Sequence, residues 1–296
     1  MPPDSQVSDW RVQAPEGWTR TSYRRASLAN WMTDPNRGAG KLAARVIVNR
    51  LWQHHFGRGL VATPNDFGVS GERPSHPELL EWLASDLVQH GWKLKRLHRL
   101  IMTSSVWMQS GDSDEARAQL DRENTLLWRR SPMRLEAEAI RDSMLSVSGL
   151  LDLQQFGPGT LDQNMRRRSI YFFIKRSQLI PMMMLFDWPE HLVSIGQRPV
   201  TTIAPQALMF MNSPQSRQWA TAFAARLPAT SPADSVQGAW RIAFGRQPAA
   251  AEMQAALMFL KNQENQHSGR PGNPQQQALT DLCQTLFSMN EFIYCE

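Results

Sequence analysis

The chain has 296 residues, of which 42% are hydrophobic and 20% charged, with a formal net charge of +5 and a pI near 9.6. These proportions are ordinary for a folded globular protein and exclude disorder along the whole chain. The charge excess is small enough to be a solvated surface and does not by itself indicate nucleic-acid binding.

Cysteine usage is too sparse for a metal or haem site built on thiolates. Cys283 and Cys295 are the two cysteines of the chain, and neither lies in a CxxC or CxxCH sequence. This excludes a zinc knuckle, a thioredoxin-type pair and a covalent haem attachment site. The sequence is compatible both with a disulfide between the two and with two free thiols. We therefore expect no cofactor in this chain.

Residues 1–23 are expected to form an irregular lead-in. They begin MPPDSQVSDWRVQAPEGW and lack the basic start and apolar stretch of a signal peptide. If the chain is a fragment, an export signal would lie upstream of it. No apolar run approaches the length that a membrane-spanning helix needs, so we expect no membrane span.

Two helices are predicted in the next part of the chain. Apolar spacing predicts a short helix from Arg24 to Met32, which ends at Asp34-Pro35. Residues 42–56 carry a continuous apolar side and predict a longer helix, with Gly57 as a left-handed C-terminal stop. The segment that follows is rich in Gly, Pro, Asn and Asp, so we expect an ordered loop.

A helix with a capped start is predicted from Ser75. Pro77 falls in its first turn, and Glu78 stands three residues after Ser75, which is the pattern of a capping box. Gly91 closes this helix, and a second helix is predicted from Lys93 to about Trp107.

The second half of the chain is expected to be helical apart from one insert. Ser131-Pro132 predicts a further capped helix start. The β-rich run Ile170–Ile174 predicts a strand. The Met-rich segment Pro181–Trp188 is expected to be buried or interfacial, and helices separated by Gly and Pro return from Ala204 onward.

Taken together, these elements predict a mainly α fold, a multi-helix globular domain with a small β appendage around residues 165–203. The expected domain spans residues 24–294. Within it the sequence suggests a subdivision into an N-terminal helical part (24–151), a β-containing insert (152–203) and a C-terminal helical part (204–294).

Several long strings of the sequence resemble one family. They are NRLWQHHFGRGLVATPNDFGVSGERPSHPELLEWLASDLV, GWKLKRLHRLIMTSSVW, RLEAEAIRDSML and NEFIY. Together they are similar to the planctomycete-specific domain one, a domain of unknown function (fifteen fifty-three), over roughly Arg24 to Tyr294. The family's strings fall on Asn49, Arg50, Trp52, Phe56, Gly57, Asp66, Phe67, Gly68, His76, Pro77, Glu78, Trp82, Arg134, Glu136 and Arg141.

The resemblance implies a cellular context more than a reaction. Members of this family typically occur in exported planctomycete proteins, often downstream of a cytochrome c-type domain. It therefore implies a periplasmic or exported location, haem c on an upstream domain or partner, and a neighbouring cytochrome c-type domain or other protein as partner. Ile195 stands where the family often has a cysteine, which excludes a thiol role at that position.

A candidate polar site lies between residues 50 and 78. Arg50 and His54 share one helix face, whereas the adjacent His54 and His55 diverge by about 100° and cannot chelate one metal together. With Asp66 and His76 they would line a pocket of an enzyme, for example a hydrolase. The alternative, which we favour, is that His54 and His76 hydrogen-bond the backbone of the long loop, because buried amides and carbonyls need partners.

The acidic residues of the RLEAE string favour structural ion pairs. Glu136 and Glu138 are two apart and diverge on a helix, which argues against a paired-carboxylate hydrolase. Helical spacing instead predicts the pairs Arg134–Glu138 and Glu138–Arg141. A metal site from His76, Asp66 and Glu136 matches no known ligand spacing, so we predict no metal.

The helices predicted from Ser75 and from Lys93 are similar in outline to a helix-turn-helix with a basic second helix. The acidic first helix argues against this reading, and nucleic-acid binding is the least favoured alternative. The leading hypothesis is an accessory module that acts through protein–protein contacts, with an enzyme as the competing class.

Overall fold

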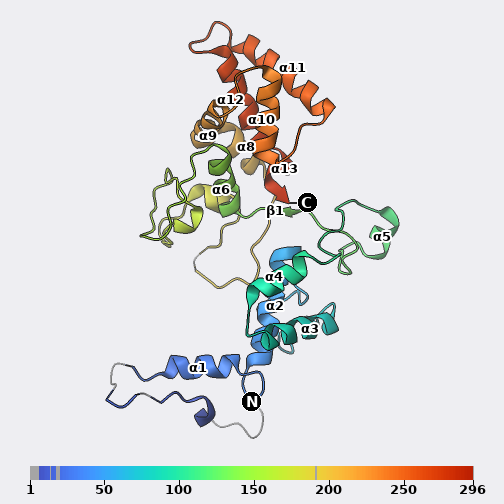
Figure 1. The fold of residues 1–296 in the computed structure, drawn as a ribbon, viewed down its shortest axis with the longest axis vertical. Coiled ribbons are helices and arrows are strands. Elements are labelled where there is room, and N and C mark those ends of the chain that lie inside the picture. The colour runs from blue at the N-terminus through green and yellow to red at the C-terminus, as the bar shows by residue number, and fades with distance from the viewer. Residues whose placement is uncertain (1–6, 14, 18–20, 191, 296) are drawn as a thin grey trace. The chain divides into compact units, whose positions relative to one another are not determined.

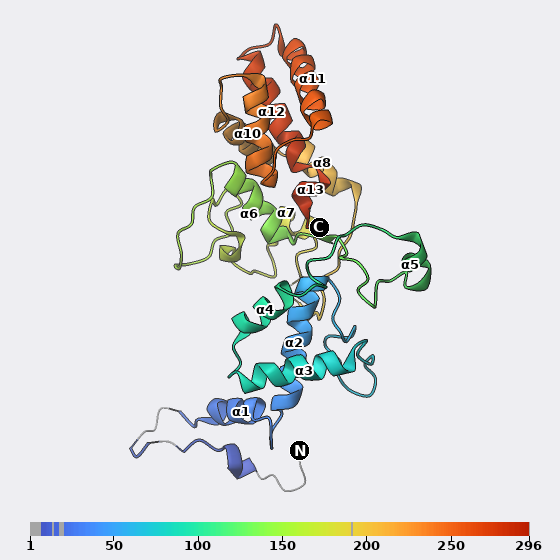
Figure 2. The same ribbon diagram turned by 45° about the vertical axis from the view of Figure 1, so that its right-hand side comes forward.

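The computed structural model describes residues 7–13, 15–17, 21–190 and 192–295 (Figures 1 and 2). Within these ranges the chain is mainly helical, and its named strands pair in one two-stranded antiparallel sheet. The predicted mainly α fold is therefore confirmed. No described helix is both long and apolar enough to cross a lipid bilayer.

The chain divides into two compact units, with the boundary between Ser131 and Pro132. The sequence had suggested divisions after residues 151 and 203. Each unit has its own buried apolar cluster.

The first unit is built from short helices. Its elements are a 3-10 helix η1 (Val7–Trp10) and the helices α1 (Arg24–Thr33), α2 (Gly40–Phe56), α3 (Pro77–Gln89), α4 (Leu94–Met102) and α5 (Glu115–Leu120). The long helix α2 packs against α3 and α4. It ends as predicted at Gly57, whose φ of 81° is the left-handed conformation that glycine adopts at low cost.

The core of the first unit gathers the apolar sides of α2, α3 and α4 with part of the loop between α2 and α3. Its buried residues are Ala44, Val48, Trp52, Leu60, Val61, Leu80, Leu83, Ala84, Leu87, Leu97 and Ile101. Because Leu60 and Val61 belong to this core, the loop is packed down as expected.

Two helix ends of the first unit differ from prediction. The capping box predicted at Ser75 does not form. The helix begins at Pro77 with His76 in the capping position, and the Ser75 hydroxyl hydrogen-bonds the His76 ring. The helix predicted to reach Trp107 ends at Met102. The hydroxyls of Thr103 and Ser104 bond the carbonyls of Arg99 and Ile101, and such local bonds compete with continuation of a helix.

The second unit carries the remaining helices and the sheet. Its elements are β1 (Met133–Arg134), α6 (Ala137–Val147), η2 (Ser169–Tyr171), α7 (Pro181–Leu185), α8 (Ala204–Asn212), α9 (Pro214–Ala225), α10 (Pro232–Phe244), α11 (Ala250–His267), α12 (Pro274–Phe287), α13 (Asn290–Ile293) and β2 (Tyr294–Cys295). Helix α12 packs against both α9 and α11.

The helix start predicted at the beginning of this unit was wrong. Ser131-Pro132 does not begin a helix, because Met133 and Arg134 instead pair antiparallel with Cys295 and Tyr294, and the helix starts at Ala137. Sequence pattern could not reveal this pairing with a segment at the far end of the unit.

The predicted strand Ile170–Ile174 is also absent, and residues 165–203 contain no named strand among those described. Residues 169–171 form the 3-10 helix η2, and isolated bridges join Asp152 to Arg167 and Thr160 to Phe172. The β-branched and aromatic side chains of this run therefore do not lie on a sheet. Ile170, Phe173 and Ile174 are exposed instead.

The Met-rich segment is part of the core. Met183, Phe186 and Trp188 are buried with α6, α9 and α12, as one of the two alternatives for this segment predicted. Cys283 on α12 is also buried, whereas Cys295 on β2 is exposed, and both are free thiols.

Candidate functional site

The four predicted site residues all lie in the first unit. Arg50 and His54 are exposed one turn apart on α2. The Arg50 guanidinium reaches Asn65 in the loop with a Nη2–Oδ1 distance of 3.5 Å. The predicted shared helix face is therefore present, but the loop partner of Arg50 is an amide.

Asp66 and His76 take part in local turns of the loop between α2 and α3. The Asp66 carboxylate accepts the Gly68 N–H at 2.8 Å, and its main-chain carbonyl accepts the Thr63 hydroxyl at 2.8 Å. The His76 ring lies 2.9 Å from the Ser75 hydroxyl. Within the described residues, no hydrogen bond or ion pair links any two of the four candidates.

The loop is braced by a residue other than the predicted histidines. Asn49 on α2 is fully buried, accepts the Val61 N–H at 2.8 Å and donates to the Val61 carbonyl at 3.0 Å. A Cβ added to Gly59 would lie 2.6 Å from the Asn49 amide nitrogen, so glycine at 59 leaves room for this pair. The structure thus assigns to Asn49 the role that we expected of His54 and His76.

A histidine pair that the sequence did not single out joins α2 to α4. His55 Nε2 and His98 Nδ1 are 2.8 Å apart, and Trp107 meets the His55 ring edge-on. The Arg130 guanidinium stacks 3.8 Å above the centre of the Trp107 ring. Burial, followed by the charges of His98, His54 and Arg130, lowers the pKa of His55. His55 is therefore neutral near neutral pH, and its ring contacts that of His98 by a hydrogen bond.

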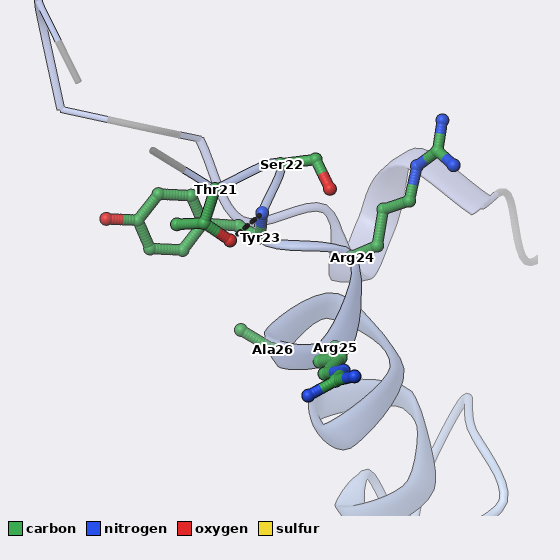
Figure 3. A pocket seen from close by; sticks show the side chains of 6 residues that line it. All are labelled: Thr21, Ser22, Tyr23, Arg24, Arg25 and Ala26. Carbon is green, nitrogen blue, oxygen red and sulfur yellow. Dashed lines mark hydrogen bonds between the residues drawn. The ribbon is translucent and has the colours of Figure 1, made fainter. Parts of the chain in front are cut away.

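No group of three or more metal-ligating side chains gathers in the part of the chain that the structure describes. A hollow at the start of α1 is lined by the contiguous residues 21–26, whose side chains Figure 3 shows. These residues include no carboxylate, histidine or cysteine. The hollow therefore lacks the side chains that most often bind transition metals.

An extended polar network lies in the second unit, beside the first turn of α6. Arg134 donates to the Asp187 carboxylate at 2.6 Å, and Asp187 also accepts the Thr201 N–H and hydroxyl, each at 2.8 Å. Gln206 at the start of α8 donates to the carbonyls of Leu185 and Thr201. Asp187 has a φ of 62°, a left-handed conformation that aspartate and asparagine adopt more readily than most other residues.

A second set of bonds extends this network. Arg198 donates to both oxygens of Glu138, at 2.8 and 3.0 Å, and lies 3.2 Å from Glu136. The Trp188 indole N–H donates to Glu138 at 2.8 Å. The predicted pairs Arg134–Glu138 and Glu138–Arg141 are therefore wrong, because each side chain finds a partner that is remote in sequence.

The electrostatics of this network indicate a structural clamp. Burial alone would raise the pKa of Glu138, but the hydrogen bonds and charge of Arg198 outweigh it and lower that pKa. Burial opposes ionisation of Asp187 as well, and bonds from Thr201 and Arg134 lower its pKa nevertheless. Both carboxylates are therefore ionised and fully engaged at neutral pH, which suits neither a general acid nor a general base.

Arg141 is a buried cation, and it is anchored mainly by carbonyls. Its side chain is 1% exposed and donates to the carbonyls of Met165 and Arg167 and to the Ser169 hydroxyl. Burial lowers its pKa to about 10, partly offset by the charge of Asp142. Arg141 therefore fixes the loop that follows α6.

The helix-turn-helix alternative rests on α3 and α4. Arg96 at the start of α4 forms two hydrogen bonds with Asp86 of α3, with Nη2–Oδ1 at 2.9 Å and Nε–Oδ2 at 3.1 Å. This cation is thus engaged within the pair of helices and is less available to phosphates. Nucleic-acid binding stays a prediction.

Comparison with known families agrees with the resemblance seen in the sequence. The sequence model of the family described as PSD1, protein of unknown function (DUF1553), matches residues 24–260. Comparisons with curated proteins and with solved structures give no match. The matched range takes in all the candidate residues of both units. The chain therefore belongs to the DUF1553 family of proteins of unknown function.

Proposed function

We propose that this chain is an accessory module that acts through protein–protein contacts. The supporting observation is an apolar surface held in place by the ion-pair network of the second unit. We call it the clamped segment and define it as residues 192–212, which run from the end of the Met-rich segment through α8. Its exposed large apolar residues are Leu192, Val193, Ile195, Val200, Ile203, Leu208 and Met211.

The clamped segment combines fixed backbone with exposed apolar side chains. Arg198, Thr201 and Gln206 tie it to α6 and α7. Helix α8 turns Gln206 and Phe210 inward and leaves Leu208 and Met211 exposed. A surface that is already ordered loses little conformational entropy on binding, which favours association.

The polar residues support an interaction role better than catalysis. The four residues proposed for an enzyme site form local contacts in or near the loop or face solvent, and no bond links any two of them among the described residues. The charged residues near α6 are paired with one another. Large apolar side chains that are exposed along one ordered segment are typical of surfaces that contact another protein. Methionine is moreover enriched at interfaces relative to the rest of the surface.

The family resemblance supplies the proposed context. We infer an exported or periplasmic protein of planctomycete origin, with a cytochrome c-type domain as neighbour. In that arrangement haem c belongs to the neighbour, and the clamped segment supplies the contact with it or with another protein of the same assembly.

The test uses the purified full chain and the purified domains and proteins encoded beside it, with binding measured by isothermal titration calorimetry. We expect the double substitution Leu208→Ser/Met211→Ser to weaken binding by roughly tenfold or more. The matched control, Leu120→Ser/Leu126→Ser, removes two exposed leucines of the first unit and should bind like the wild type. A wild-type chain that stays monomeric and binds none of these proteins would refute the proposal.

A further inference from the structure

The loop between α6 and α7 presents apolar and basic side chains together on the second unit. We call it the basic loop and define it as residues 152–179. In both views it extends sideways from α6 (Figures 1 and 2). Its exposed large apolar residues are Leu153, Phe156, Ile170, Phe173, Ile174 and Leu179.

The backbone of the basic loop is pinned, so the exposure of these side chains is built into the fold. Arg141 holds the loop carbonyls from the core, and Met165 and Phe172 are buried as anchors. Arg167 stacks 3.6 Å from the centre of the Tyr171 ring and donates to carbonyls on the opposite side of the loop, among them that of Pro158.

Phe156 is an apolar residue of the loop that the backbone holds in an exposed position. It is 80% exposed, and its φ of 65° is a left-handed conformation that costs an aromatic residue free energy. The Phe156 N–H donates to the Tyr171 hydroxyl at 2.8 Å, which holds this conformation. The ring is thus kept in solvent at a cost that its own contacts within the chain do not explain.

The charge of the basic loop is strongly positive. It contains five cationic side chains and two carboxylates, those of Asp152 and Asp162. Among the described residues, no carboxylate pairs with Arg166, Lys175 or Arg176, and all three are exposed. Lys175 and Arg176 directly follow the exposed Phe173 and Ile174, so cationic and apolar groups are adjacent in the sequence.

We propose that the basic loop binds the surface of a membrane that contains anionic phospholipids. Phe and Ile side chains enter the boundary between headgroups and acyl chains, while Lys and Arg meet the phosphates. Charge complementarity favours an anionic lipid surface over a purely apolar partner, because such a partner would offer no negative charge to Arg166, Lys175 and Arg176. The inference rests on a different surface from the proposed protein contact and does not depend on it.

The experiment measures co-flotation of the full chain with vesicles of phosphatidylcholine alone and of phosphatidylcholine mixed with phosphatidylglycerol. We expect the wild type to bind the mixed vesicles and to be released as ionic strength rises. Each of Phe173→Ser/Ile174→Ser and Lys175→Gln/Arg176→Gln should lower the partition coefficient roughly tenfold or more. None of these four residues is a buried anchor of the loop.

Two matched controls separate the loop from the rest of the chain. Lys93→Gln/Lys95→Gln makes the same change in net charge on exposed residues of the first unit, and Leu208→Ser/Met211→Ser removes two exposed apolar residues of α8. Both should bind vesicles like the wild type, and circular dichroism verifies that every variant is folded.

Three results would overturn the proposal. The first is that the folded wild type does not bind anionic vesicles at low ionic strength. The second is that the loop variants and the control variants bind the vesicles equally well. The third is that Phe173→Ser/Ile174→Ser abolishes binding to a protein partner while the wild type binds no vesicles. Because Leu208→Ser/Met211→Ser tests the protein contact separately, failure of one proposal is distinguishable from failure of the other.

Discussion

The ion pair between Arg134 and Asp187 should be strongly coupled. Arg134→Met leaves the Asp187 carboxylate without its cation, and Asp187→Asn leaves the guanidinium without its anion. The two side chains are 4% and 11% exposed, so either unpaired charge stays largely buried. We expect each single substitution to lower the free energy of unfolding by about 3–5 kcal/mol. Asparagine is the replacement of choice because it tolerates the left-handed backbone at 187.

The double variant should cost much less than the two single variants together. Removing both charges leaves no unpaired ion, and the remaining cost is the lost hydrogen bond from Arg134 to the Thr201 carbonyl, at about 1–3 kcal/mol. The coupling free energy of the cycle is therefore at least about 3 kcal/mol. Urea unfolding followed by tryptophan fluorescence gives the three values, and hydrogen exchange of peptides from 186–206 assigns the change to the clamped segment.

Additivity of the two substitutions would refute this reasoning. If the double variant equalled the sum of the singles within about 0.5 kcal/mol, the two groups would not interact in the folded protein. An uncharged control at the same site is Thr201→Val, which removes one hydroxyl bond to Asp187. We expect it to cost about 1 kcal/mol, well below either charge variant.

Three further predictions concern other parts of the chain. Burial lowers the pKa of His55, so the unfolded state takes up a proton at a higher pH than the folded state does. The first unit should therefore lose stability as pH falls below about 6.5, by at most about 1.4 kcal/mol per pH unit for this group. Urea unfolding of His55→Gln should lack this contribution to the pH dependence. Burial raises the pKa of the Cys283 thiol, so iodoacetamide should label only the exposed Cys295 until the protein is denatured. Mass spectrometry measures the labelling of each cysteine, and equal labelling of both in the folded protein would contradict the structure. Asn49→Leu leaves two polar groups of Val61 unpaired and should cost about 3 kcal/mol in urea unfolding, whereas a loss under about 1 kcal/mol would show that the loop has other braces.

Local features were predictable because their causes are local. Gly57 ends α2 in the left-handed conformation at the position that the sequence pattern predicts, and Ser213 caps α9 through its hydroxyl. A glycine after an apolar helix and a serine before a proline carry their own geometric reasons. The mainly α fold follows from such signals repeated along the chain.

The polar clusters were not predictable because their partners are remote. Helical spacing offered Glu138 two arginines within a turn, but its actual partner Arg198 lies on a segment 60 residues away. His55 likewise finds His98 only after α2 and α4 pack. Spacing within one helix states which residues share a face and says nothing about which other element covers that face.

The pairing of β1 with β2 makes the second unit suitable for circular permutation. Because β1 and β2 pair Met133 with Cys295, the first and last residues of this unit leave it side by side. A short linker could therefore join these ends, and the chain could be reopened in the exposed turn between α11 and α12 without changing any packing contact. Such a circular permutant of residues 132–295 should be a useful form in which to move the whole helical unit into the loop of another protein.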